Sequence, residues 1–237
     1  MKNLQIKIRG SPFETIMETA TPKDIRYRPL YSLAEVSRYA RVRPATLRAW
    51  TRNAGSGVVI PVAGPSVAPF SFIDLIESYV VESLRHTYRV PMQRIRRAVE
   101  WLGQQYGTVH PLAELNLETD GHDVFIREFE TPINASRRGQ SGFPEVLARY
   151  LQRIERDKGR IPVRFYPYTY AEAPKAIVMD PAVAYGRPVV VGTRVTSQMI
   201  FERYGGGESL RDIALDYDLD VSLVEEALRC EIDRIAA

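Results

Sequence analysis

The chain has 237 residues, of which 45% are hydrophobic and 26% are charged, and this length suffices for two modest domains. No apolar run approaches the roughly 20 residues that a membrane-spanning helix needs, and the N-terminus lacks the continuous apolar stretch of a secretory signal. The single cysteine, Cys230, excludes an intramolecular disulfide and suits a reducing compartment. We therefore expect a folded cytoplasmic protein.

The charge is unevenly divided along the chain, although the net charge is only +3. Residues 1–170 contain 25 Lys and Arg against 17 Asp and Glu, a balance of +8. Residues 171–237 contain 7 against 12, a balance of −5. This asymmetry is consistent with two halves that bind different partners, but two ordinary solvated surfaces would give the same imbalance.

The first predicted elements are two short helices. Ser32 and Glu35 have the spacing of a capping box, which predicts a helix over Leu33–Ala40. The second helix begins at Pro44, where a missing backbone N–H costs nothing, and it ends at the glycines from Gly55 onward. Two short helices separated by three or four residues form a helix-turn-helix.

The middle of the chain predicts alternating short β runs and helices, with loop composition over residues 131–142. We expect β runs at Val58–Val62 and Val67–Phe72, helices at Phe72–Thr87 and Met92–Tyr106, a hairpin of Leu112–Leu117 with Val124–Phe129, a helix at Phe143–Asp157 and an extended stretch at Ile161–Tyr170.

The C-terminal segment predicts a small β element followed by three helices. We expect short strands at Ile177–Met179 and Pro188–Val191, then helices from Thr196 or Ser197 to Tyr204, from Glu208 or Ser209 to about Tyr217, and over Val221–Ile235. The fold class is therefore mainly α with small β elements, in three parts: residues 1–107, 108–174 and 175–237.

The second short helix is the candidate recognition helix, because its apolar residues can face the core while polar side chains point outward. A second basic stretch, Arg85–Arg97, contains no acidic residue. Arginine can pair with guanine or hold phosphate, so these basic residues favour DNA binding. The alternative is a helix-turn-helix that serves only for packing or for binding another protein. The predicted DNA-binding residues are Arg41, Arg43, Thr46, Arg48, Thr51, Arg52, Arg85, Arg94 and Arg97.

The segments Tyr31–Trp50 and Phe70–Val99 resemble the DNA-binding domain of the MerR family in the order of their elements. The resemblance implies a winged helix-turn-helix within residues 1–107, with Thr46 and Arg48 near DNA. A small hairpin, a helix and a connecting segment would follow in residues 108–174.

The sequence departs from the MerR pattern in three places. Arg43 stands where that family usually has a capping serine, and the wing, Asn53–Phe72, contains no Lys or Arg. The long dimerising helix is also missing, since Gly107 and a predicted hairpin follow. We still expect a homodimer, because helix-turn-helix proteins commonly read paired half-sites.

The segment GRPVVVGTRV, Gly186–Val195, is the most distinctive motif of the C-terminal part. Its glycines permit backbone angles that other residues resist, and Pro188–Val191 is a candidate buried strand. Arg194 could complete an anion-binding turn, but it is better suited to brace a helix end or a carboxylate, because the glycine spacing of a phosphate loop is missing.

Residues Ile177–Leu228 resemble a widespread prokaryotic domain family with Asp-Pro, Gly-Arg-Pro and Gly-Thr-Arg in this order. Members are largely antitoxins of type II toxin–antitoxin pairs, so the whole chain resembles a large VapB-type antitoxin. The resemblance implies two partners, a cognate PIN-domain (VapC-like) ribonuclease toxin and operator DNA, in a homodimer or a toxin–antitoxin hetero-oligomer.

A PIN active site is a cluster of carboxylates, which an inhibitor can neutralise by inserting arginine or can block with an apolar helix. The candidate toxin-binding residues are Arg187, Arg194, Arg229 and Arg234.

The residues that most often perform catalysis are scattered. His86, His110 and His122 lack the spacing of metal ligands, and Cys230 lies among apolar residues of the last helix. We therefore expect no enzymatic activity, no metal and no cofactor. The alternatives are a stand-alone MerR-like transcription regulator and an enzyme acting on nucleic acid.

Overall fold

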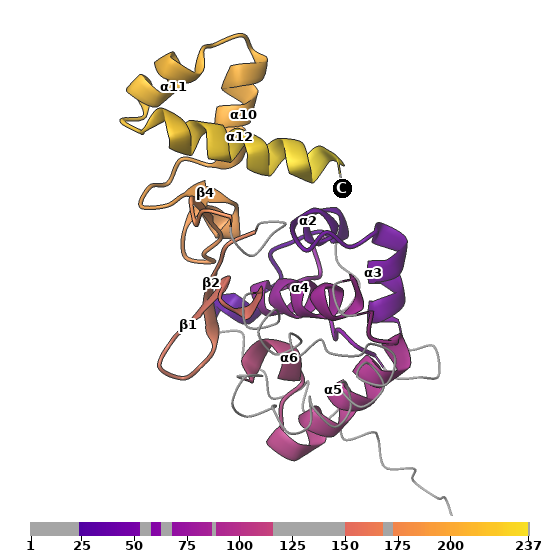
Figure 1. The fold of residues 1–237 in the computed structure, drawn as a ribbon. Helices are drawn as coiled ribbons and strands as arrows, with labels where there is room; N and C mark the ends of the chain where they lie inside the picture. Colours follow the sequence, from indigo (N-terminus) through magenta and orange to yellow (C-terminus); the bar gives the residue numbers. More distant parts are fainter. Residues whose placement is uncertain are drawn as a thin grey trace, which may run out of the picture.

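The computed structural model describes residues 24–52, 58–62, 68–86, 89–115, 150–167 and 173–236, the last range without the side chains of residues 233–236. Within these residues the fold is mainly helical with small antiparallel sheets, which confirms the predicted fold class. No helix in this part of the chain is long and apolar enough to cross a membrane. Figure 1 shows α10, α11 and α12 together at one end of the molecule, with the small strands between them and the remaining helices.

The N-terminal elements are η1 (Ile25–Tyr27), α2 (Leu33–Tyr39), α3 (Pro44–Thr51), α4 (Phe72–His86), α5 (Met92–Tyr106) and α6 (Pro111–Glu114). The middle part contains the strands β1 (Ile154–Arg156) and β2 (Pro162–Phe165). The C-terminal part begins with the strand β3 (Ile177–Val178), the short 3-10 helix η3 (Ala184–Gly186) and the strand β4 (Val189–Val190). The last three helices are α10 (Ser197–Gly205), α11 (Leu210–Asp216) and α12 (Val221–Ala236).

The pair α2–α3 forms as predicted. The capping box is complete: the Ser32 hydroxyl accepts from the Glu35 amide at 3.2 Å, and the Glu35 carboxylate accepts from the Ser32 amide at 2.8 Å. The turn between the helices passes through Arg41 at a φ of 57°. The second helix begins at Pro44 without a side-chain cap from Arg43, and it buries Leu47 and Trp50.

The two predicted β runs after α3 do not pair with each other in the described residues. Val59 and Ile60 donate their amides to the Trp50 carbonyl, at 3.0 and 3.2 Å, and both side chains are fully buried. Phe70 instead pairs with Tyr31, in an antiparallel bridge across the start of α2. Burial against the end of α3 therefore replaces the expected ladder.

The predicted hairpin is also wrong where the structure describes it, and so is the end of the predicted helix after it. Leu112 lies in α6 rather than in a strand, because Pro111 begins a helical turn and the Glu77 carboxylate accepts from the Leu112 amide at 3.2 Å. The partner run Val124–Phe129 lies outside the described residues, as do residues 143–149 of the predicted helix Phe143–Asp157, in which Tyr150 and Leu151 are helical. The end of that predicted helix is β1, because Ile154 pairs with Phe165 of β2.

The C-terminal predictions are confirmed. The strands β3 and β4 pair antiparallel, with Ile177 opposite Val190, and Thr196 and Ser209 cap α10 and α11 with their hydroxyls. A bridge between Phe165 and Met179 joins the β1–β2 pair to β3. The small strands therefore connect the C-terminal helices to the rest of the molecule.

Two hydrophobic clusters form the interior. The larger combines buried residues of α2–α6 with Ile154, Phe165 and Met179 from the strands. The second lies among α10, α11 and α12 and includes the buried Cys230. The strands thus contribute apolar side chains to both clusters.

A buried ionisable pair joins α4 to α6. The His110 ring lies 2.9 Å from the Glu77 carboxylate, which has no exposed surface, and 3.6 Å from that of Asp74. Burial raises the pKa of Glu77 to about 7, against the lowering effect of His110. Burial opposes the charge on His110, but the hydrogen bond and charge of Glu77 outweigh it and raise the pKa of His110 to about 9.

We expect the folded chain to lose stability as the solution becomes alkaline. Both shifts mean that the folded pair binds protons more tightly than the unfolded chain does. The His110 contribution is fully present below its ordinary pKa of 6.5 and is lost as the pH rises through about 9. Urea unfolding at pH 6.5 to 9.5 should show this decline, and the variant His110→Leu/Glu77→Gln should give a flatter profile. Equal slopes for the two proteins would contradict the assignment.

Candidate DNA and partner interfaces

The predicted recognition helix exposes its basic side chains. Arg43, Arg48 and Arg52 are exposed, while Leu47 and Trp50 are buried on the opposite side. Thr51 donates its hydroxyl back to the Arg48 carbonyl at 3.1 Å, so this hydroxyl is engaged within the helix. The other two predicted residues, Arg41 and Thr46, are half-buried. Helix α3 therefore presents arginine guanidinium groups to solvent from a rigid base.

The second basic stretch lies on α5 and at the end of α4. Arg97 is exposed and Arg94 is half-buried. Arg85 is exposed and donates a hydrogen bond to the Val90 carbonyl at 3.4 Å. Figure 1 shows α5 at the opposite end of the molecule from α10 and α11. The second basic stretch thus lies on the part of the molecule away from α10 and α11.

The arginine of the Gly-Arg-Pro motif contacts the helix-turn-helix. The Arg187 guanidinium lies 3.5 Å from the carboxylate of Glu35, which is the same carboxylate that caps α2. Beside it, the buried Tyr31 hydroxyl donates to the Gly186 carbonyl at 2.9 Å. A Cβ at Gly186 would lie only 2.1 Å from this hydroxyl oxygen. The motif therefore has a structural role at the junction of the two halves.

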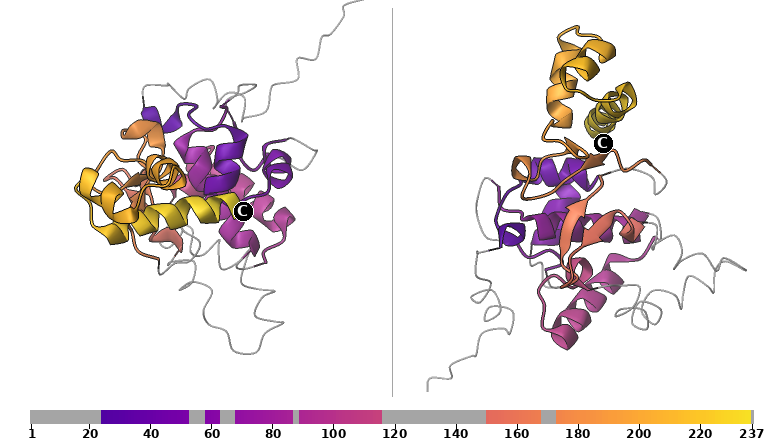
Figure 2. Two further views of the ribbon diagram at one scale, coloured as in Figure 1. Left: turned by 90° about the horizontal axis from the view of Figure 1, so that it is seen from above. Right: turned by 90° about the vertical axis from the view of Figure 1, so that its left-hand side faces the viewer.

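The junction also includes the last helix. Residues of α12 contact α2 directly, and the two views of Figure 2 agree that α12 runs over the helix-turn-helix side of the molecule. The sequence alone did not reveal this junction, because Tyr31 and Gly186 are separated by 155 positions. The only local signal was the glycine itself, whose φ of 73° an L side chain rarely adopts.

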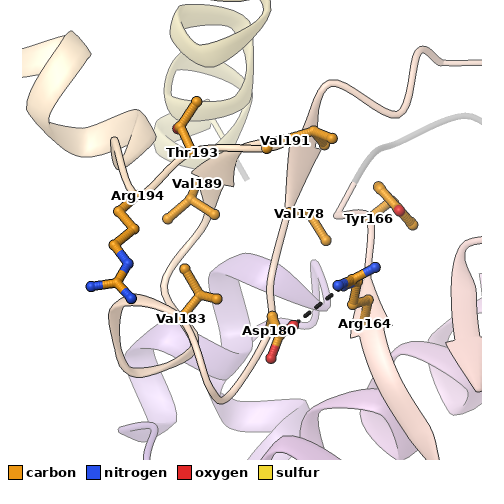
Figure 3. A pocket seen from close by; sticks show the side chains of 10 residues that line it. Arg164, Tyr166, Val178, Asp180, Val183, Val189, Val191, Thr193 and Arg194 are labelled. Atoms are coloured by element: carbon orange, nitrogen blue, oxygen red, sulfur yellow. Dashed lines mark hydrogen bonds and ion pairs between the residues drawn. The ribbon is translucent and has the colours of Figure 1, made fainter. Parts of the chain in front are cut away.

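The rest of the GRPVVVGTRV motif borders a half-open hollow of about 650 Å³, shown in Figure 3. Its floor is formed by valines, and the exposed Arg194 lies at its rim. Across the hollow, Arg164 lies 3.2 Å from Asp180 and 3.5 Å from Glu155. Periodicity alone could not reveal the hollow, because it forms only when β2, β3 and β4 are brought together.

The other two candidate arginines lie on α12. Arg229 is exposed and pairs with Glu226 at 2.5 Å, whereas the side chain of Arg234 lies outside the described residues. The four candidates for toxin binding therefore do not form one cluster: Arg187 lies at the junction, Arg194 at the hollow and Arg229 on the last helix.

Comparison with known proteins identifies the family. Residues 177–229 match the family model described as "Protein of unknown function (DUF433)". The chain is 32% identical to "Putative antitoxin VapB45" of Mycobacterium tuberculosis, over 88% of this chain and 95% of that protein. It is 28% identical to "Uncharacterized protein Rv2308" of the same organism, over 85% of this chain and 89% of that protein.

A solved structure shows the same fold. The X-ray crystal structure of Rv2018 from Mycobacterium tuberculosis matches with a TM-score of 0.70 and 31% identity, covering 85% of this chain and 98% of that one. The chain therefore belongs to the family of VapB-type antitoxins, and this confirms the family expected from its C-terminal motifs.

Proposed function

We propose that this protein is an antitoxin that neutralises a cognate PIN-domain (VapC-like) ribonuclease and binds operator DNA to autoregulate its operon. The observation that supports this most is its relation to a protein named as a VapB antitoxin, over nearly the whole length of both chains. It would act in the cytoplasm as a non-catalytic, dimeric binding protein without a cofactor. Residues 1–107 would bind DNA, and residues 175–237 would bind the toxin.

The DNA-binding half of the proposal rests on α3. Exposed Arg48 in the helix, with exposed Arg43 and Arg52 at its two ends, can place guanidinium groups against phosphates or guanine edges. The basic residues Arg85, Arg94 and Arg97 would add phosphate contacts, which strengthen binding at low salt. Because Arg48 is central on the helix, it is the residue to test first.

We expect Arg48→Ala to weaken binding to the DNA upstream of this gene by about 1–3 kcal/mol, since one base or phosphate contact is lost. Electrophoretic mobility shifts at fixed low salt would measure the change. Arg211→Ala, an exposed arginine on α11, is the matched control and should bind normally. Unchanged affinity of the Arg48 variant would rule out α3 as the recognition helix.

The toxin-binding half of the proposal rests on the outer face of α12. Glu225, Arg229 and Ile232 are all exposed at helical spacing, and Ile232 is 53% exposed although it is a large apolar residue. An amphipathic helix face of this kind fits an apolar groove, and an arginine beside it can reach a carboxylate. Arg234 would extend the same helix toward the partner.

We expect the double variant Arg229→Glu/Ile232→Gln to bind the product of the adjacent gene at least about tenfold more weakly than the natural chain. Co-expression followed by calorimetric titration would measure the affinity, with Lys158→Glu, at an exposed position between β1 and β2, as a control that keeps the α12 face. Unchanged affinity of the double variant would remove α12 as the contact surface. Failure of the natural chain to bind would contradict the antitoxin function itself.

A further inference from the structure

Arg187 differs from the other arginines that the sequence suggested for toxin binding, because its partner lies in the helix-turn-helix. Its guanidinium is 3.5 Å from Oε1 of Glu35, and its side chain is 52% exposed, against 22% for that of Glu35. The other oxygen of this carboxylate, Oε2, accepts from the amide and from the hydroxyl of Ser32, both at 2.8 Å. The capping box therefore uses one oxygen of Glu35, and Arg187 faces the other.

The backbone beside Arg187 is held against the start of α2. Buried Tyr31 donates its hydroxyl to the Gly186 carbonyl at 2.9 Å, one residue before Arg187. Tyr31 is itself fixed by Phe70: its amide donates to the Phe70 carbonyl at 2.9 Å, and its carbonyl accepts from the Phe70 amide at 3.1 Å. Buried contacts thus place Arg187 near Glu35, and the ion pair is not needed for this.

The ion pair itself adds little to the stability of the junction. Water already solvates partly exposed charges, and salt screens them, so such pairs contribute little to folding. The distance of 3.5 Å is also longer than the about 2.7–2.9 Å of a strong charge-assisted hydrogen bond. The main physical effect of Arg187 is therefore on the local charge of this surface.

That charge matters because Glu35 is the single acidic residue of the helix-turn-helix. Between Tyr31 and Arg52, all of which the structure describes, the remaining charged residues are Arg38, Arg41, Arg43, Arg48 and Arg52. In a helix-turn-helix bound to DNA, the second helix enters the major groove while the first crosses the phosphate backbone. A carboxylate on the first helix, α2, opposes binding by repelling phosphates over roughly a Debye length, about 10 Å at 0.1 M salt.

We propose that Arg187 serves DNA binding, because it neutralises Glu35 and so removes the one repulsive charge of the helix-turn-helix. The inference rests on the DNA binding included in the proposed function and adds to it a residue of the C-terminal motif. Since Arg187 acts through Glu35, it is a positioning residue for charge and does not read bases. The Gly-Arg-Pro motif then belongs to the DNA-binding half, and the exposed face of α12 is left for the toxin.

The affinity of the full chain for the DNA upstream of this gene, measured by fluorescence anisotropy at increasing salt, tests this role. We expect Arg187→Gln to weaken binding roughly three- to tenfold at low salt, and the deficit should shrink as salt screens the charges. Arg187→Lys keeps the charge and should bind almost as the natural chain does. Arg194→Gln, which removes an exposed arginine of the same motif, is the matched control and should bind normally.

Removing the carboxylate separates neutralisation from any other effect of Arg187. Glu35→Gln keeps the capping box, because glutamine serves at this position as glutamate does. We expect Glu35→Gln/Arg187→Gln to bind DNA as tightly as the natural chain, since neither variant position then carries a charge. A double variant that binds as weakly as Arg187→Gln would overturn the inference, because the loss would not depend on Glu35.

The complex with the adjacent gene product provides the opposite readout. Calorimetric titration should give the same affinity for Arg187→Gln as for the natural chain, and urea unfolding should show that the variant is folded. Normal DNA binding by Arg187→Gln would overturn the inference, and weaker binding to the gene product would then assign Arg187 to the toxin. A natural chain that does not bind this DNA would instead contradict the DNA-binding half of the proposed function.

Discussion

Replacing Gly186 with alanine should destabilise the folded chain by roughly 2–4 kcal/mol. About 1 kcal/mol comes from the left-handed backbone, since Gly186 has a φ of 73° that an alanine adopts only with strain. The rest comes from Tyr31, whose buried hydroxyl oxygen would lie only 2.1 Å from the new Cβ. Moving Tyr31 breaks its hydrogen bond to the Gly186 carbonyl and overpacks the junction. Urea unfolding measures the difference.

Gly192→Ala is the matched control for this prediction. Gly192 has a similar φ of 80°, but a Cβ added there would meet no atom within 4 Å, so only the backbone strain of about 1 kcal/mol should appear. The variant Tyr31→Phe/Gly186→Ala should lose less stability than the sum of its two single changes, because the residues are in contact. Equal losses for the two glycine variants would show that the Tyr31 contact contributes nothing.

Replacing His110 with leucine should cost about 3–5 kcal/mol at neutral pH. The substitution leaves the Glu77 carboxylate fully buried without its cationic partner, and removing one partner of a buried pair costs far more than removing both. The loss should be largest near and below pH 6.5 and should shrink as the pH rises through about 9, because the natural chain then loses the contribution of protonated His110. Thermal or urea unfolding at pH 6.5 and pH 9.5 measures both effects.

The double variant His110→Leu/Glu77→Gln separates the charge from the packing. Glutamine keeps an acceptor for the Leu112 amide while it removes the buried charge, so most of the lost stability should return. A double variant that is as unstable as His110→Leu would mean that shape rather than charge determines the stability of this contact between α4 and α6.

Elements with local signals were predictable from the sequence. Ser32 and Glu35 close the capping box of α2, and Thr196 and Ser209 cap the helices that they were expected to begin. Local hydrogen bonds determine these helix ends, so short sequence patterns carry the information. The strands Ile177–Val178 and Val189–Val190 were equally clear, because β-branched residues lie on both sides of a glycine-containing turn.

Elements fixed by distant contacts were not predictable. Leu112 lies in a helical turn because Glu77, 35 positions away, binds its amide, and no local pattern carries this information. Ile154 is in a strand because Phe165 pairs with it, although the residues before it have helical composition. In both cases a tertiary contact overrides the local preference.

The residues of the candidate interfaces also divide into those that a local pattern predicts and those that depend on distant contacts. Exposure of Arg48 follows from the spacing of Leu47 and Trp50, which the sequence displays. The pairing of Arg187 with Glu35 does not, because it joins two segments that are adjacent only in the folded chain. The sequence therefore predicts exposed arginines more easily than it predicts which of them the protein uses internally.

The growth of cells that express the product of the adjacent gene tests the proposed function most directly. Expression of that product alone should arrest growth, and co-expression of the natural chain should restore it through a stable complex of the two proteins. The variant Arg229→Glu/Ile232→Gln, produced at the same level, should restore growth poorly. Arrest that persists in the presence of the folded natural chain, with no complex between the two proteins, would contradict the antitoxin function.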